Sequence, residues 1–430
     1  MSRAFVWRRE LPFLRAAWLN VPAGQTGRVE RIVSETRAST HGNETAQFMF
    51  RPYRDELDRP LGARGPAATR HWTINGDFTT LNPMGVARYA REVTLALDAL
   101  MVEKHPLTRN LHLDLVAPRA PATPLLLQAI TTRIAPEYSR PRLPQFWVQM
   151  QLPRHVKGGL LSFCNLAPVM VRRQVACIHD VQTLTSPRSY SRGFRLAHRI
   201  ILPLLGRRAS AITTVSNLSR DELVHHGVAP AEKIVVTYNG ADHAKGWRPE
   251  CSRRDFRAAR PFVLCLLRNQ VHKNPELLLR LARPLEVIGV DMMIMGELDA
   301  ELTGRLQRSG AQNVRVLGRI SDDDFAAALS QALCFLLPSR TEGFGLPAVE
   351  AMMWGCPVVA STSPCLPEVC GSAALFADPD DTTAWISAIA RLLASPELRQ
   401  RFSSAGRKRA KEFNWRRVAI TYLTLMAEID

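Results

Sequence analysis

The stretch PSRTEGFGLPAVEAMMWGCPVVAS, residues 338–361, runs from the end of one apolar segment through a glycine-rich turn into a second apolar segment. In the turn, Gly343 and Gly345 permit backbone conformations and close approaches that a β-carbon would forbid. Pro347 suits the first turn of a helix, and Gly355 favours the end of that helix. The stretch therefore predicts a strand, a tight turn and a short helix, followed by another strand.

Two carboxylates, Glu342 and Glu350, lie on either side of this turn. We expect Glu350 in the first turn of the helix, where backbone amides would stabilise an anion such as a diphosphate. These amides belong to Gly343, Phe344, Gly345 and Leu346. A carboxylate beside such an anion would instead accept hydrogen bonds from sugar hydroxyls. The structural alternative is that the two acids only cap the helix.

The rest of the chain restricts the class of protein. Its 430 residues are enough for roughly two to three domains, and a hydrophobic content of 46% is typical of a globular protein. No uncharged apolar run approaches the length of about 18 residues that a membrane helix needs. Glu10 and Pro12 interrupt the apolar core that a secretory signal would require. The eight cysteines form no CxxC pair, which favours free thiols in a reducing cytosol, so we expect a cytoplasmic protein.

The formal net charge of +17 makes nucleic acid the first partner to consider. Of the 56 basic residues, however, 49 are arginines that are scattered along the chain. No helix-turn-helix, zinc-binding or RNA-binding aromatic motif accompanies them. A biased composition explains the charge equally well. We therefore expect no nucleic-acid partner and keep a basic nucleic-acid-binding protein as the non-enzyme alternative.

Apolar strand-like runs alternate with helical patterns in two successive series, which predicts parallel strands with crossover helices. Each series is typical of a Rossmann-like, doubly wound domain, whose ligands bind at the carboxyl ends of the strands. We therefore predict an α/β protein with two such domains that face a central cleft. The predicted divisions are a linker-like N-terminal extension (1–68), an N-terminal domain (69–253), a C-terminal domain (254–412) and a closing helix (413–430).

Several blocks, in the order in which they occur, resemble the retaining glycosyltransferases of the GT-B class. The resemblance is to the large family 4 of nucleotide-sugar-dependent enzymes, many of which are mannosyltransferases. Besides the stretch at 338–361, the blocks are VACIHDV, TTVSNLSRDEL, VVTYNGAD, LLRNQVHKNPELL, VRVLGRISDDDFAAALSQA and LPEVCGSAALFADPDD. The resemblance extends from about residue 70 to about residue 420. It implies that the N-terminal domain holds the acceptor and the C-terminal domain holds the nucleotide-sugar donor.

The resemblance also implies roles for single residues of the C-terminal domain. Glu350 would hold the ribose of the donor nucleotide, and Glu342 would hold a hydroxyl of the donor sugar near the reacting carbon. Arg268 and Lys273 match the basic pair that neutralises the diphosphate, whose negative charge increases as the glycosidic bond breaks. Because the chain contains only seven lysines, a lysine at this matching position is informative.

Two positions of the N-terminal domain match the family as well. His179 matches a histidine that faces the donor sugar, although a histidine that ends an apolar strand is more often structural. Gly85 matches a loop glycine under the diphosphate. The chain departs from the family pattern at Ala87 and Leu267, where glycines are frequent, and neither departure removes a charged group.

The expected reaction is transfer of mannose from GDP-mannose, with retention of configuration, to a saccharide or a polyprenyl-linked glycan in bacterial surface polysaccharide synthesis. A UDP-sugar donor and a sugar-nucleotide 2-epimerase of the same fold are the alternatives. Asp378 and Asp380 form a DxD-like pair of the kind that holds a metal ion, but they precede a helix, where aspartate is a common cap. We interpret this pair as structural and expect no metal or other cofactor.

Two segments combine apolar and basic side chains in a way that favours peripheral contact with an anionic membrane, here the inner face of the plasma membrane. The first has helical spacing and contains Arg192, Arg195, Leu196, Arg199, Ile200 and Leu204. The second contains Trp7, Leu11, Leu14 and Trp18 beside several arginines, but Pro12 interrupts it. A solvated surface helix is the alternative interpretation of the first segment.

Overall fold

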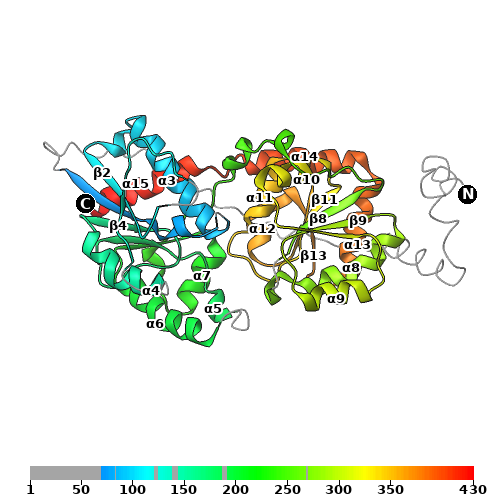
Figure 1. The fold of residues 1–430 in the computed structure, drawn as a ribbon, viewed down its shortest axis with the longest axis horizontal. Coiled ribbons are helices and arrows are strands. Elements are labelled where there is room, and N and C mark those ends of the chain that lie inside the picture. The colour runs from blue at the N-terminus through cyan, green and yellow to red at the C-terminus, as the bar shows by residue number, and fades with distance from the viewer. Residues whose placement is uncertain (1–68, 83, 121–123, 138–143, 186–190, 268–269) are drawn as a thin grey trace, which may run out of the picture.

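A computed structural model describes residues 69–430 except 83, 121–123, 138–143, 186–190 and 268–269. In this part of the chain, two domains lie side by side along the long axis of the molecule, and each is built around a parallel sheet (Figure 1). The N-terminal extension, with its segment around Trp7, and the predicted site residue Arg268 lie outside the described residues.

The N-terminal sheet contains seven parallel strands in the order β3-β2-β1-β4-β5-β6-β7. They are β1 (Arg70–Asn75), β2 (Leu111–Ala117), β3 (Thr131–Ile134), β4 (Gly159–Ser162), β5 (Gln174–Cys177), β6 (Ala211–Thr214) and β7 (Ile234–Val236). Every residue of β4, β5 and β6 is buried, as expected for a parallel sheet that is covered on both faces.

The C-terminal sheet contains six parallel strands in the order β10-β9-β8-β11-β12-β13. They are β8 (Phe262–Leu266), β9 (Asp291–Met295), β10 (Val314–Gly318), β11 (Cys334–Leu337), β12 (Val358–Ser361) and β13 (Ala374–Ala377). Within this sheet the chain begins in the centre at β8 and continues through β9 to β10 at one edge. It then returns to β11 beside β8 and continues through β12 to β13 at the other edge. Because β8 and β11 are parallel neighbours at this reversal, the loops that follow them start side by side.

Helices cover both sheets. In the N-terminal domain the described helices are α3 (Val86–Val102), α4 (Pro144–Phe146), α5 (Gln182–Thr185), α6 (Arg192–Arg208) and α7 (Asn217–His225). Those that follow are α8 (Pro275–Val287), α9 (Ala300–Arg308), α10 (Asp322–Gln331), α11 (Leu346–Met353), α12 (Cys365–Cys370), α13 (Thr382–Ala394), α14 (Pro396–Ala410) and α15 (Trp415–Ile429). Two short 3-10 turns also contribute to the site, η8 (Asp242–Gly246) and η10 (Val271–Lys273).

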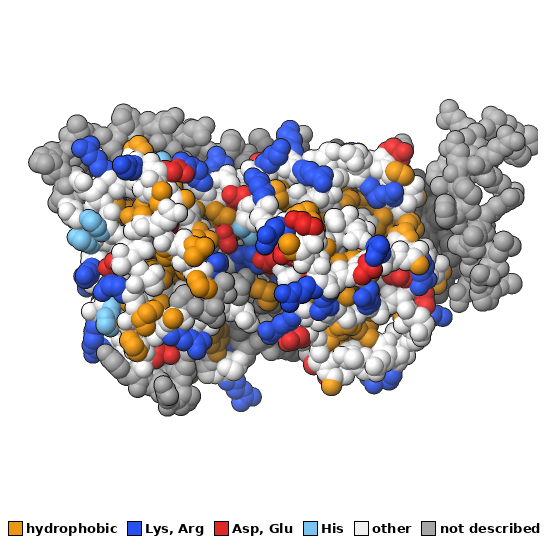
Figure 2. Space-filling view, turned by 45° about the horizontal axis from the view of Figure 1, so that its top comes forward, with side chains coloured by type: hydrophobic (Ala, Val, Ile, Leu, Met, Phe, Trp, Pro, Cys, Tyr) orange, Lys and Arg blue, Asp and Glu red, His pale blue; other side chains and the backbone are white. Residues whose placement is uncertain are grey.

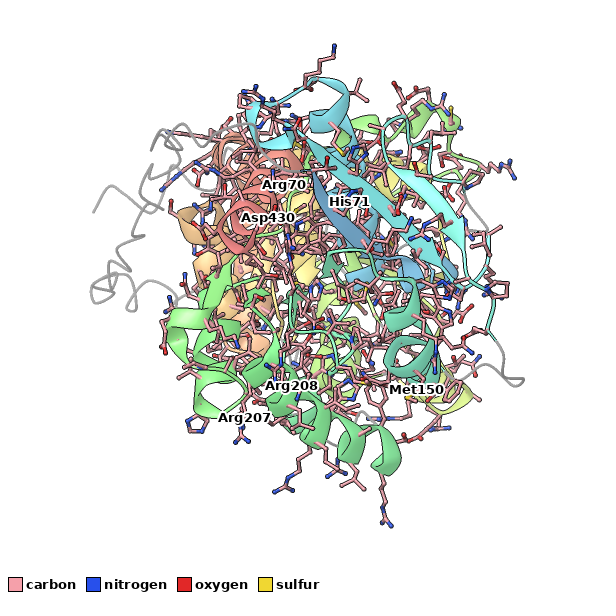
Figure 3. All side chains as sticks on the ribbon, turned by 90° about the vertical axis from the view of Figure 1, so that its left-hand side faces the viewer. Arg70, His71, Met150, Arg207, Arg208 and Asp430 are labelled. Carbon is pink, nitrogen blue, oxygen red and sulfur yellow. The ribbon has the colours of Figure 1, made fainter. Side chains whose placement is uncertain are left out.

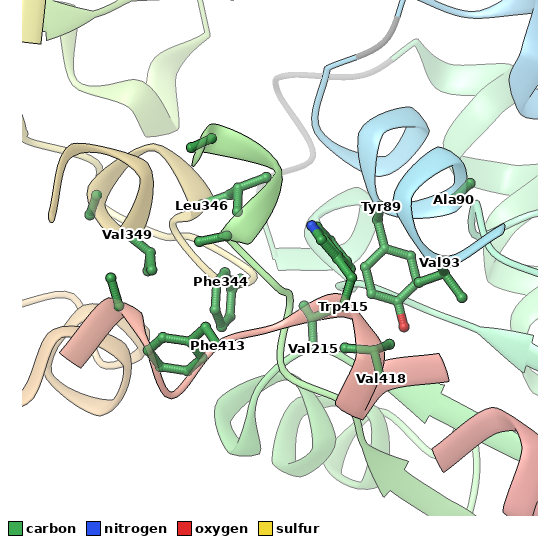
Figure 4. Close-up of a cluster of buried hydrophobic side chains, with 14 of the residues drawn as sticks. Tyr89, Ala90, Val93, Val215, Phe344, Leu346, Val349, Phe413, Trp415 and Val418 are labelled. Atoms are coloured by element: carbon green, nitrogen blue, oxygen red, sulfur yellow. The ribbon is translucent and has the colours of Figure 1, made fainter. Parts of the chain in front are cut away.

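The last helix, α15, returns to the N-terminal domain and packs on α3 (Figure 1). The hydroxyl groups of Tyr422 and Tyr89 lie 2.9 Å apart in this contact. Trp415 packs edge-on against Tyr89, with ring centroids 5.6 Å apart, and Phe413 packs edge-on against Phe344 of the C-terminal domain, at 5.4 Å. One hydrophobic cluster therefore extends through the junction between the domains (Figure 4).

The predicted alternation of strands and helices is confirmed in both domains, but the pattern does not predict β3, α9 or α14. β3 is an edge strand whose residues are mostly exposed, so it lacks the apolar run that marks a buried strand. α9 and α14 are strongly polar and bury only a few side chains each. Their position is set by tertiary packing, which a local pattern does not contain.

All eight cysteines are free thiols, and six of them are buried. The expectation of unpaired cysteines is therefore confirmed. Among the helices that the structure describes, we find none with both the length and the apolar character needed to cross a bilayer.

Candidate functional site

The turn after β11 meets the N-terminal domain directly. Gly345 has a φ of 85°, and a β-carbon there would come within 2.5 Å of a methyl group of Leu366. A β-carbon at Gly343 would lie 3.1 Å from the carbonyl oxygen of His179, on the other domain. The Ser219 hydroxyl, in the first turn of α7, lies 3.4 Å from the Gly343 carbonyl oxygen. Conformation thus requires glycine at 345, and the close approach of the two domains favours it at 343.

Glu342 and Lys273 form an ion pair at the carboxyl edge of the C-terminal sheet, with Lys273 Nζ 2.7 Å from Glu342 Oε1. The Ser339 hydroxyl donates a hydrogen bond to the same oxygen at 2.6 Å. Burial alone would raise the pKa of Glu342, but the Lys273 ammonium and the two hydrogen bonds outweigh it and lower the pKa. Glu342 is therefore ionised at neutral pH, and both of these contacts are made by its Oε1.

The turn between β8 and α8 positions Lys273. Lys273 ends η10, and the next residue, Asn274, has a φ of 57°, in the left-handed region. The Asn274 side-chain amide donates to the carbonyl oxygens of Pro338, at 3.2 Å, and of Pro379, at 2.7 Å. These bonds tie the turn that carries Lys273 to the loop that carries Glu342. The structure thus brings together two residues that are far apart in the sequence.

Glu350 lies in the second turn of α11, so its predicted place in the first turn is wrong. α11 begins at Leu346, which makes Glu350 its fifth residue, and the first turn contains no acidic side chain. A helix-capping role does not account for it. Its Oε1 instead lies 2.9 Å from Nε2 of His243 and 3.9 Å from Nε of Arg88. The acid is buried, and its partners come from outside the C-terminal sheet.

Arg88 links Glu350 to the junction between the domains. It lies in the first turn of α3, and its guanidinium forms two hydrogen bonds with the carboxylate of Asp322, at 2.6 and 3.0 Å. It also lies over the ring of Trp247, 5.7 Å from the centroid. α3 starts after Gly85, whose φ is 57°. A β-carbon at Gly85 would meet no atom within 4 Å, so conformation rather than space requires glycine there, and its contact with a diphosphate stays a prediction.

The ring of His179 packs inside the N-terminal domain. Its Nε2 lies 2.7 Å from the carbonyl oxygen of Phe163, and the ring meets Tyr89 edge-on with centroids 4.7 Å apart. Burial alone would lower the pKa of His179, but the Cys177 thiol and the Phe163 carbonyl raise it. The main-chain carbonyl of His179 is the group that approaches the turn after β11. A contact between the ring and a donor sugar stays a prediction.

Asp180 is a carboxylate that the sequence pattern did not indicate, although it follows His179 directly. A β-carbon at Gly343 would lie 3.6 Å from Asp180 Oδ2, and Oδ1 accepts a hydrogen bond from the Gln182 amide at 2.9 Å. Burial raises the pKa of Asp180, and the Lys273 ammonium opposes this shift. Charged groups from both domains therefore share the space beside the turn.

Glu368 makes a second contact across the junction. It lies on α12, and its Oε1 accepts hydrogen bonds from the amide of Asn217, at 2.7 Å, and from the hydroxyl of Tyr238, at 2.9 Å. Its Oε2 accepts from the amide of Leu218, at 3.2 Å. These amides begin α7 and have no partner inside that helix. The C-terminal domain thus caps a helix of the N-terminal domain, a role that the LPEVC block alone does not reveal.

The DxD-like pair makes structural contacts, but neither aspartate caps the helix that follows, because the N-cap of α13 is Asp381. Asp380 pairs with Arg340 through two hydrogen bonds, at 2.6 and 2.8 Å, and Asp378 accepts a hydrogen bond from the Asp380 amide at 2.8 Å. In the described part of the chain, no three histidine, cysteine or acidic side chains converge as ligands for one metal ion.

Comparison of the sequence with known proteins adds an independent finding. The profile of the family described as glycosyl transferases group 1 matches residues 252–409. The chain is 31% identical over 261 residues to O-antigen chain mannosyltransferase B of Escherichia coli, which covers 58% of this chain and 68% of that protein. It is 26% identical over 243 residues to the O-antigen chain mannosyltransferase RfbU of Salmonella typhimurium, with coverage of 55% and 65%.

Solved structures share the fold. Sucrose-phosphate synthase from Thermosynechococcus elongatus matches with a TM-score of 0.64 and 20% identity, over 84% of this chain and 99% of that one. WaaG, a glycosyltransferase involved in lipopolysaccharide biosynthesis, matches with a TM-score of 0.60 and 12% identity, over 83% and 99%. At these identities the likeness concerns the fold alone. It confirms the predicted arrangement of two Rossmann-like domains.

Proposed function

Because this chain belongs to the group 1 glycosyl transferases, we propose that it transfers mannose from GDP-mannose to a saccharide or a polyprenyl-linked glycan in bacterial surface polysaccharide synthesis. The chain is a nucleotide-sugar-dependent hexosyltransferase with a GT-B fold. Its similarity to O-antigen chain mannosyltransferases supports mannose as the sugar and a glycan chain as the acceptor. The observation that carries the proposal is the ion pair of Lys273 and Glu342, which is partly buried where the two domains meet.

The pair suits a donor that has a sugar on one side and a diphosphate on the other. The Lys273 ammonium has three N–H donors, and Glu342 uses one of them, so phosphate oxygens can accept from the others. Its positive charge stabilises the negative charge that develops on the diphosphate leaving group. Oε2 of Glu342 accepts a hydrogen bond from a sugar hydroxyl. Arg268 supplies a second cation, and Glu350 holds the ribose.

The proposed reaction retains the configuration at the anomeric carbon. The bond from this carbon to the diphosphate oxygen breaks, and a bond to the acceptor oxygen forms on the same face of the sugar. The acceptor proton passes to the departing phosphate oxygen. Lys273, Arg268 and Glu342 hold the donor during this step. Because the two side-chain cations compensate the diphosphate charge, the scheme requires no metal ion.

A panel of nucleotide sugars tests the donor. We expect GDP-mannose to give the largest increase in Tm and, without an acceptor, to be hydrolysed slowly to GDP and mannose. A larger increase in Tm with a UDP-sugar would identify that UDP-sugar, rather than GDP-mannose, as the donor. Recovery of an epimerised nucleotide sugar from the donor alone would identify a 2-epimerase. With an acceptor present, a β-linked product from the α-linked donor would reject retention.

The distribution of charge favours a sugar-nucleotide enzyme over a nucleic-acid-binding protein. On the face shown in Figure 2, lysine and arginine side chains are spread over both domains with acidic side chains among them. A nucleic-acid site would gather them along one groove or patch. Tight binding of DNA or RNA that weakens steeply with salt would contradict this part of the proposal.

The proposal includes contact between α6 and an anionic membrane, on the cytoplasmic side of the plasma membrane, where a polyprenyl-linked acceptor would lie. The outer face of α6 exposes Leu196 by 61%, Ile200 by 55% and Leu204 by 40%. Arginines at both ends of this helix are exposed, and Figure 3 shows Arg207 and Arg208 at the lower edge of the N-terminal domain. Aliphatic side chains among arginines fit the boundary between acyl chains and anionic headgroups.

Flotation of the intact chain with vesicles that contain an anionic lipid tests this contact. We expect the wild-type chain to float and the double variant Leu196→Gln/Ile200→Gln to stay in the soluble fraction. Leu126→Gln is the matched control, because Leu126 is 84% exposed in the same domain but lies outside α6. No flotation of the wild-type chain would identify α6 as a solvated surface helix.

A further inference from the structure

His243 lies where the chain passes from the N-terminal to the C-terminal domain, and both of its ring nitrogens have partners. Nε1 of Trp415 lies 3.0 Å from Nδ1 of His243, and Nε2 of His243 lies 2.9 Å from Oε1 of Glu350. The side chains of His243 and Glu350 are only 4% and 7% exposed. Water therefore competes little for either hydrogen bond.

These partners determine which nitrogen of His243 carries the proton. The indole N–H of Trp415 is only a donor, so Nδ1 must accept and carries no proton. An ionised Glu350 is only an acceptor, so Nε2 carries the proton and donates it. A second proton on Nδ1 would point at the indole N–H and abolish that hydrogen bond. The geometry therefore places the donating proton on Nε2 and holds the imidazole in one orientation.

The backbone around His243 fixes this orientation further. The amide of Trp415 donates to Oδ1 of Asp242 at 2.9 Å, and the amide of Ala241 donates to the carbonyl oxygen of Phe413 at 3.1 Å. The two segments that cross between the domains are thus bonded to each other next to His243. Trp415 and His243 are held in register by main-chain contacts as well as by their side chains.

We infer that His243 is a positioning residue for the ribose of the donor nucleotide. By donating to Oε1 of Glu350, it orients the carboxylate so that Oε2 accepts a hydrogen bond from a ribose hydroxyl. This inference rests on the proposed function, because the ribose contact of Glu350 is part of that proposal. Trp415 contributes by keeping His243 in the donating tautomer.

Titration calorimetry of the intact chain with GDP and with 2′-deoxy- and 3′-deoxy-GDP tests the inference; UDP and its analogues replace them if the donor screen selects UDP. His243→Phe keeps an aromatic ring but removes the donor. We expect it to weaken GDP binding by about tenfold, as typical for the loss of one hydrogen bond to a charged group. We also expect a smaller preference for GDP over at least one deoxy analogue. His243→Gln places an amide N–H near the position of Nε2. It should therefore keep most of the GDP affinity and most of the preference for GDP over the deoxy analogues.

His105→Phe is the matched control, because Nδ1 of His105 also accepts one hydrogen bond, from the Leu107 amide at 3.3 Å, in a turn after α3. We expect it to leave GDP affinity and the ribose preference unchanged. If His243→Phe lowered only Tm and kept both binding properties, His243 would be structural and the inference wrong. If the wild-type chain bound no nucleoside diphosphate at all, the proposed function itself would fail, and the inference with it.

Discussion

Glu342, which is partly buried, and Glu350, which is buried, both have basic partners, but they are held in different ways. The partner of Glu342 is Lys273, which lies on the neighbouring loop of the same sheet. The partners of Glu350 are His243, at the domain junction, and Arg88, on the first helix of the N-terminal domain. The geometry of Glu342 is therefore set by one domain, whereas that of Glu350 depends on how the two domains meet.

This difference affects how each acid would respond to motion of the domains. Polar contacts cross the junction beside the hydrophobic cluster, and any relative motion of the two domains would change those contacts. An ion pair inside one sheet survives such motion and is preorganised for the charge that develops in the reaction. Contacts at the junction form only when the domains are together. Under the proposed function, the contact of Glu350 with the nucleotide therefore depends on the position of both domains, whereas the contact of Glu342 with the reacting sugar depends on one.

Glu342→Gln is expected to have the largest effect on turnover. The amide keeps the shape of the side chain but removes the charge that holds Lys273. We expect kcat to fall by about 10²- to 10³-fold, the range seen when one preorganised electrostatic contact is lost. GDP affinity, measured by calorimetry, should change little. Near-native turnover would contradict the role of the pair.

A matched ion pair on the surface controls for the simple loss of a carboxylate. Glu276 pairs with Arg305 in the same domain, at 2.6 Å, but about half of its side chain is exposed. Exposed pairs of this kind contribute little. Glu276→Gln should therefore leave both kcat and GDP affinity unchanged.

Glu350→Gln is expected to act on binding rather than on turnover. The amide oxygen can still accept from His243, but the group that faces the ribose becomes a donor. We expect GDP affinity to fall by about tenfold, with kcat at saturating donor within a few-fold of the wild type. Equal effects of the Glu342 and Glu350 changes on both quantities would contradict the division of roles.

The sequence predicted the Glu342 side of this comparison because its determinants are local. A strand, two glycines and a helix start follow one another within residues 338–361, and the matching lysine ends the loop of the neighbouring strand. Parallel neighbours in a sheet bring such loops together wherever they occur in the chain. The pattern of strands and helices predicted the turn that carries Glu342, and the resemblance to the glycosyltransferases implied that Lys273 belongs to the same site.

The Glu350 side was not predictable in the same way. His243 and Glu350 are 107 positions apart, and the contact depends on the path of the crossover segment and on the return of α15. A hydrophobic pattern does not specify either. The pattern does not specify the direction of the His179 ring either, since the end of an apolar strand fixes where a residue lies but not where its side chain points.

Glu368→Gln tests the junction without changing either acid. The amide is a weaker acceptor for the amides that begin α7, so we expect a loss of about 1 kcal/mol in the free energy of unfolding, typical of a helix cap. Because the change loosens the junction, GDP affinity should decrease slightly, and kcat at saturating donor should not. Urea denaturation and calorimetry measure the two effects. A lower kcat with unchanged GDP affinity would show that the junction affects turnover, as Glu342 is expected to do, rather than nucleotide binding.

Asp180→Asn has the smallest expected effect. Unlike the other changes, it should raise the stability of the protein at pH 7. Burial raises the pKa of Asp180 above its ordinary value of 3.8, so the folded state binds a proton more tightly than the unfolded state. The ionised group therefore lowers stability at neutral pH, and this cost disappears as the pH falls below the unfolded value. The neutral amide removes the cost, so the variant should have a slightly higher Tm than the wild type at pH 7 and the same Tm below about pH 3.8. A variant that is less stable at pH 7 would show that the Gln182 amide and the charges of His179 and Lys273 together stabilise the ionised Asp180 more than burial penalises it.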